Sequence, residues 1–83
     1  MIERLLLEGK TLKFEFEEEN GNIIVEVDIP RVSFEGITFY VEEQVNGVFY
    51  NHTMELESLL LFLNKSVLSC IDFNIYQDGA QIY

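Results

Sequence analysis

The chain has 83 residues, which suffices for one domain with a single hydrophobic core but not for a core plus a deep, enclosed active site. Fifteen acidic against five basic residues give a net charge of −10, so direct binding to nucleic acid or to an anionic membrane is not expected. Because 48% of the residues are hydrophobic, the core-poor class of disordered acidic proteins is also excluded, and we expect a folded protein that prefers basic partners.

The first predicted element is the segment Met1–Glu8. Ile2, Leu5 and Leu6 recur at the spacing of one helical face, and Gly9 follows as a residue that commonly ends helices. The pattern therefore favours a short N-terminal helix, with a strand as the alternative.

A β-hairpin follows, because two alternating runs flank Asn20-Gly21, the strongest short-range hairpin signal. The runs are residues 11–19 and 22–29. A two-residue turn at Asn20-Gly21 would place all apolar side chains on one face and would set Glu15 directly opposite Glu26. Like charges opposite each other repel, so folding alone does not favour this pair, whereas a cationic partner would.

A second hairpin is predicted to begin at about Gly36, since Pro30 breaks the preceding strand. Asn46-Gly47 is again a two-residue turn, and it would pair Val45 with Val48. Two hairpins with the same turn and one apolar face each predict an antiparallel sheet of about four to six strands.

The segment Thr53–Leu68 predicts the main helix, with its body at about residues 54–67, as a cover for the apolar face. Thr53 is the expected N-cap, and Lys65 in the last turn would suit the negative helix end. Apolar residues at helical spacing are Leu56, Leu59, Leu60, Leu63 and Val67. Leu61 and Phe62 widen this stripe, so the helix is either well buried or partly offered to a partner.

The C-terminal part is expected to form a third hairpin. Residues Cys70–Tyr76 alternate in polarity, and Asp78-Gly79 turns the chain into a last short strand that ends at Tyr83. That register would place Ile75 beside Ile82. The predicted fold class is therefore α+β, in one acidic domain that covers residues 1–83.

The candidate binding site is the polar face of the predicted sheet. Its members are Glu15, Glu17, Glu26, Asp28, Tyr40 and Glu42, the last two if the hairpins share one sheet. A face that serves only solubility usually mixes both charge signs, and this one is mostly negative. The alternative interpretation is a solvated outer face that keeps the protein soluble and discourages edge pairing.

Catalytic and metal chemistry find little support in the residues. His52 and Cys70 are a possible base and nucleophile, but no motif marks a third, orienting group, and Cys70 is more simply a small hydrophobic residue. Neither a calcium-loop spacing nor a glycine-rich phosphate loop occurs, so no enzyme activity, metal or cofactor is expected. A single cysteine and the lack of a signal peptide indicate a cytoplasmic location.

In general character the chain resembles the small acidic inhibitors that phages and mobile elements encode, namely anti-CRISPR and anti-restriction proteins. The resemblance rests on the compact size, the net charge of −10 and the acidic residues of the predicted sheet, not on a motif. It implies a non-catalytic DNA mimic that binds a basic groove of a nuclease or another defence effector, in the host cytoplasm if phage-encoded.

Two other classes remain open. The chain is similar in the same way to bacterial immunity proteins or antitoxins, which neutralise a basic toxin. It is also compatible with an assembly or regulatory subunit that docks through the apolar surface of its helix, and a homodimer is possible through Leu61, Phe62 and Phe49.

Overall fold

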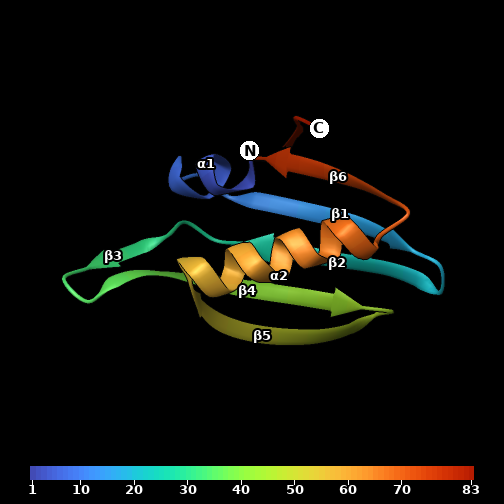
Figure 1. Cartoon of the computed structure of the whole chain (residues 1–83), viewed down its shortest axis with the longest axis horizontal. Coiled ribbons are helices and arrows are strands. Elements are labelled where there is room, and N and C mark those ends of the chain that lie inside the picture. Colours follow the sequence, from blue (N-terminus) through green and yellow to red (C-terminus); the bar gives the residue numbers. More distant parts are fainter.

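The computed structural model describes residues 1–83, and its centre is one antiparallel sheet of seven strands with both helices on the same face (Figure 1). The elements are α1 (Ile2–Leu7), β1 (Leu12–Glu18), β2 (Gly21–Val27), β3 (Arg31–Ser33), β4 (Gly36–Val45), β5 (Val48–Glu55), α2 (Leu56–Ser69), β6 (Asp72–Gln77) and β7 (Ala80–Gln81). The predicted α+β class is confirmed. The sheet has one strand more than the expected maximum of six because the short β3 adds to it.

The strand order follows β3-β4-β2-β1-β6-β7, and β5 pairs with the other side of β4. β4 is the longest strand, and along one side it contacts first β3 and then β2. The two predicted hairpins therefore share one sheet, with β2 and β4 adjacent.

The core lies between the helices and what we call the inner face of the sheet; the opposite side is the outer face. Alternating positions of the strands supply Phe14, Phe16 and Phe39 to the inner face, where all are almost completely buried. Leu59 and Leu63 of α2 are fully buried against them, and in Figure 1 α2 crosses in front of β2 and β4. The predicted helical stripe is confirmed, and burial of each such side chain contributes roughly 1.5–3 kcal/mol.

Two of the three predicted turns are confirmed. Asn46 and Gly47 have φ of 49° and 84°, and Asp78 and Gly79 have φ of 50° and 85°, as type I′ turns require. The pair Val45–Val48 forms as predicted. The backbone bond from Ile82 N to Ile75 O, 2.9 Å long, agrees with the expected third hairpin, although β6 begins only at Asp72.

The register of the first hairpin was predicted wrongly. The turn lies at Glu19-Asn20, so Glu18 pairs with Gly21, Lys13 with Glu26, and Glu15 with Ile24. The expected opposition of Glu15 and Glu26 does not exist. Because the pairing moves by two residues, every side chain keeps its predicted face.

The cause lies in the neighbouring hairpin. The side-chain amide of Asn46 occupies the place where a Cβ of Gly21 would be, and Gly21 has a φ of 138° that other residues rarely adopt. Ile23 pairs with Val45 directly beside this contact. Packing of the second hairpin against the first therefore favours the register in which Gly21 is the first residue of β2. In the predicted register Gly21 would have been part of the turn.

The segment after Pro30 was expected to be a break but forms β3. Proline does end β2, whose last residue is Val27, yet Arg31 then pairs with Thr38 of β4. β3 and the start of β4 form an arm that extends from the body at the left of Figure 1, and Phe34 at its tip is fully exposed.

The start of α2 also differs from the prediction. Thr53 pairs with Tyr40 inside β5 and is not the N-cap; the helix begins at Leu56 after Glu55, which makes no side-chain capping bond. Strand pairing along β4 outweighs a single capping bond here. The helix continues to Ser69, so its last turn contains no basic residue.

Candidate functional site

The outer face of the sheet carries polar side chains, and the strand register determines which of them are neighbours. Lys13 on β1 lies opposite Tyr76 on β6 and opposite Glu26 on β2. Glu26 lies opposite Glu42 on β4, which in turn lies opposite Asn51 on β5. These residues form one continuous row from β6 to β5.

A groove of about 700 Å³ follows this row on the outer face. Side chains that line it include Lys13, Glu26, Asp28, Tyr40, Glu42, Asn51, Thr53 and Tyr76. Asp28 is held beside Tyr40 because its backbone N–H donates to the Tyr40 carbonyl at 3.0 Å. The groove is open to solvent, and strands far apart in the sequence build its floor.

All six predicted site residues lie on the outer face, but they do not form one cluster. Glu26, Asp28, Tyr40 and Glu42 line the groove. Glu15 and Glu17 line a smaller hollow of about 330 Å³ on the other side of Lys13.

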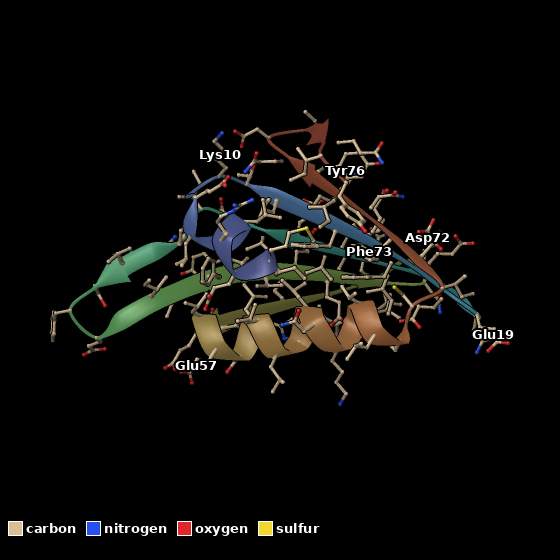
Figure 2. All side chains as sticks on the ribbon, turned by 45° about the horizontal axis from the view of Figure 1, so that its top comes forward. Lys10, Glu19, Glu57, Asp72, Phe73 and Tyr76 are labelled. Carbon is tan, nitrogen blue, oxygen red and sulfur yellow. The ribbon has the colours of Figure 1, made fainter.

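Sequence reasoning missed Asp72, which lies directly opposite Glu17 across β1 and β6. It also missed Asn51, Thr53 and Tyr76 as groove residues. The alternation of residues 70–76 did place Asp72 and Tyr76 on the face opposite Phe73, and Figure 2 shows Phe73 on the helix side of β6. The pairing of β6 with β1, which brings these residues beside Lys13 and Glu17, could not be predicted from the sequence pattern.

Few cations compensate the groove carboxylates. Lys13 Nζ lies 3.6 Å from Glu15 Oε2 and 4.8 Å from the centre of the Tyr76 ring. Arg31 reaches in from β3, with its guanidinium carbon 4.1 Å from the centre of the Tyr40 ring. The one ion pair between a lysine or arginine and a carboxylate is Lys13–Glu15, and Glu43 has a hydrogen bond with His52, so Glu26, Asp28 and Glu42 have no cationic partner.

Tyr76 is sensitive to this negative field. The hydrogen bond with the Glu15 carboxylate raises the pKa of Tyr76, partial desolvation and the Glu15 charge raise it further, and Lys13 opposes the shift. The Glu15 carboxylate therefore favours the protonated form of the Tyr76 hydroxyl, which lies at the β6 end of the row.

The pair considered for catalysis is not arranged for it. His52 Nε2 lies 3.2 Å from Glu43 Oε1, while Cys70 Sγ donates to the Val67 carbonyl at 3.2 Å, and the two residues make no bond to each other. Burial raises the pKa of the Cys70 thiol, which disfavours the thiolate that a nucleophile needs. Both residues have structural contacts instead.

No group of three or more His, Cys, Asp or Glu side chains converges closely enough to hold a metal ion. Neither helix has the length and apolar character that a bilayer crossing requires. Comparisons of the chain with protein-family models, curated proteins and solved structures found no match. Fold and site together define an α+β domain with an acidic groove on the uncovered face of its sheet.

Proposed function

We propose that this protein is a non-catalytic inhibitor that binds a basic partner protein through its acidic groove. The observation that carries the proposal is the juxtaposition of Glu26 and Glu42 on adjacent strands, with Asp28 beside them and no cation paired to any of the three. Carboxylates directly opposite each other cost stability, and bound cationic side chains would remove that cost.

The partner class is a nucleic-acid-binding protein, such as a nuclease or another defence effector, whose cations normally contact phosphates. In such a complex the carboxylates act in place of phosphates and accelerate association by steering the partner. Because the carboxylates line a hollow rather than a ridge, a basic element that protrudes from the partner fits them best. Half-exposed Tyr40 adds an aromatic contact, and the cytoplasm is the expected place.

The test compares two variants that lose the same amount of charge. Glu26→Gln with Glu42→Gln removes two groove carboxylates, whereas Glu19→Gln with Glu35→Gln removes two from exposed turns outside it. Once pull-down at low salt has identified a partner, its affinity is measured by calorimetry at low and high NaCl. We expect the groove variant to bind about tenfold more weakly or worse and to lose salt sensitivity, with the turn variant close to wild type.

Equal weakening in both variants would show that net charge alone attracts the partner and would remove the groove from the mechanism. The same proposal covers an immunity protein or antitoxin, for which the partner is a basic toxin. Inhibition of the partner's activity in stoichiometric amounts distinguishes an inhibitor from a passive binder.

The second candidate is an assembly or regulatory subunit that docks through α2. Leu61 and Leu68 are 71% and 87% exposed, whereas Phe62 packs against the core and is unsuitable for this surface. Replacement of both leucines by serine would then abolish a binding that salt does not weaken. Binding unaffected by this change excludes the subunit function.

A further inference from the structure

β5 is an open edge of the sheet, because it pairs with β4 alone. Val45 and Val48 flank a two-residue turn, so Val48, Tyr50 and every second residue after them bond to β4. The N–H and C=O groups of the alternate residues Phe49, Asn51 and Thr53 therefore point away from the sheet. No backbone or side-chain hydrogen bond in the protein uses them.

This edge lacks the devices that normally protect one. Between Val48 and Glu55 there is no proline, lysine or arginine, and the pairing with β4 runs without a bulge. Val48, Phe49 and Tyr50 are 53%, 58% and 50% exposed. In Figure 1 β5 forms the lower margin of the sheet, with no element beyond it.

The opposite margin is different. β7 has only the residues Ala80 and Gln81, and the chain after it bonds back to Ile75. β5 is therefore the one long edge available to another strand.

The acidic groove extends to this edge, since Asn51 and Thr53 are part of its lining. A strand added to β5 would lie about 4.8 Å beyond Asn51 and about twice that distance from Glu42. Long basic side chains on its outer face would reach across Asn51 to the groove carboxylates. On its inner face the neighbours are Tyr50, His52 and Met54; Tyr50 and Met54 favour apolar residues, and the His52 ring already has Glu43 as its partner.

We propose that the partner docks as an additional β-strand on β5, through an extended segment in which basic residues alternate with apolar ones. This inference rests on the proposed function and describes how the partner would be recognised. Backbone hydrogen bonds along β5 would fix the position of the added strand, and the groove would select positively charged side chains. A second copy of this chain is a poor occupant, because its own β5 has no lysine or arginine and it brings a further charge of −10.

The test uses a capped eight-residue peptide of alternating lysine and valine, titrated by calorimetry. In a peptide strand antiparallel to β5 with its lysines on the outer face, the lysine N–H groups face β5, whereas the valine N–H groups face solvent. Two N-methylated peptides of the same charge follow, one methylated at the lysines and one at the valines. We expect methylation at lysine to weaken binding about tenfold and methylation at valine to leave it nearly unchanged.

A matched pair of protein variants tests the same edge. Asn51→Pro removes an outward N–H that the fold does not use, and Asn51→Ala keeps it. Both variants lose the Asn51 side chain and only the proline also loses the N–H, so Asn51→Pro should bind the peptide about tenfold more weakly than Asn51→Ala, with circular dichroism unchanged in both. If Asn51→Pro fails to fold, the comparison of the two methylated peptides on the wild-type protein still tests whether the peptide adds to β5 as a strand.

Equal binding of all three peptides would overturn the strand-addition inference while leaving an electrostatic groove intact. Failure of the unmethylated peptide to bind at concentrations up to about 1 mM would also overturn the strand-addition inference. The proposed function is tested separately, by the groove variants. A wild-type dimer that Asn51→Pro dissociates would assign the edge to a second copy and contradict the inference.

Discussion

At the residue scale, Gly21 and Tyr76 show how a single neighbouring side chain changes the backbone position of one residue and the pKa of another. Gly21 begins β2 because the Asn46 amide fills the space beside it, which determines the partner of every residue in β1. The hydrogen bond with the Glu15 carboxylate raises the pKa of Tyr76. Neither effect is visible in the local sequence, since Asn46 lies in the β4–β5 turn and Glu15 lies on β1, both far along the chain from the residues they affect.

Replacement of Gly21 by alanine should destabilise the protein by about 1–3 kcal/mol, because the new Cβ would collide with Asn46 and because the backbone has a positive φ. Adding Asn46→Gly removes the collision and suits the positive φ at that turn position, so the double variant should regain part of the loss. Urea unfolding measures both. If the losses of stability in the two single variants simply add in the double variant, the contact between Gly21 and Asn46 does not limit residue 21.

Tyr76 should be the tyrosine that ionises late. Its folded pKa is raised above the ordinary value of 10.0, so its stabilising contribution is complete below that pH and is lost as pH rises through the folded pKa. In an absorbance titration of tyrosinate, Tyr76→Phe should remove a late component, and Glu15→Gln should move it to lower pH. An unchanged curve in Glu15→Gln would rule out the carboxylate as the cause.

At the element scale, the pairing of β2 with β4 creates a like-charge contact that the turns alone did not require. Glu26 and Glu42 meet because the second hairpin packs antiparallel against the first, and Glu17 and Asp72 meet in the same way across β1 and β6. The sequence led us to expect such a contact between Glu15 and Glu26; in the structure Lys13 lies opposite Glu26 but forms its ion pair with Glu15.

Neutralising Glu42 should therefore stabilise the free protein while it weakens partner binding. We expect Glu42→Gln to raise the free energy of unfolding by about 0.2–1 kcal/mol, since it relieves the repulsion with Glu26. Glu35→Gln in the exposed turn is the control and should change stability by less than about 0.5 kcal/mol. Calorimetric melting compares them, and a less stable Glu42→Gln would disprove the strain.

At the scale of the whole molecule, charge and shape act together. A net charge of −10 on a body whose Cα radius of gyration is 12.3 Å makes the fold repel itself, and the groove concentrates part of that repulsion on one face. Long-range terms of this kind are screened by salt over about 8 Å at physiological ionic strength.

The melting temperature should thus rise with NaCl, by about 4–8 °C for each kcal/mol of repulsion removed. Partner binding should respond in the opposite direction and weaken. The groove variant Glu26→Gln with Glu42→Gln should show a smaller rise in melting temperature than wild type. A melting temperature that falls with salt would mean that attractive ion pairs dominate, contrary to the single lysine–carboxylate pair present.

The local sequence by itself determined the alternation of the strands, the helical stripe of α2, the short N-terminal helix and the turns at Asn46-Gly47 and Asp78-Gly79. These features depend on side-chain period and on φ values that a few residues select. They were enough to predict an antiparallel α+β fold with the six candidate site residues on one face.

Only the tertiary structure decided the register of the first hairpin, the strand made by β3, the separation of Glu15 and Glu17 from the groove, and the open edge of β5. Each depends on which strands meet, and that choice is made by packing between segments distant in the sequence. Because side chains alternate with a period of two, the face of each residue survives a two-residue shift in pairing, whereas its opposite neighbour does not.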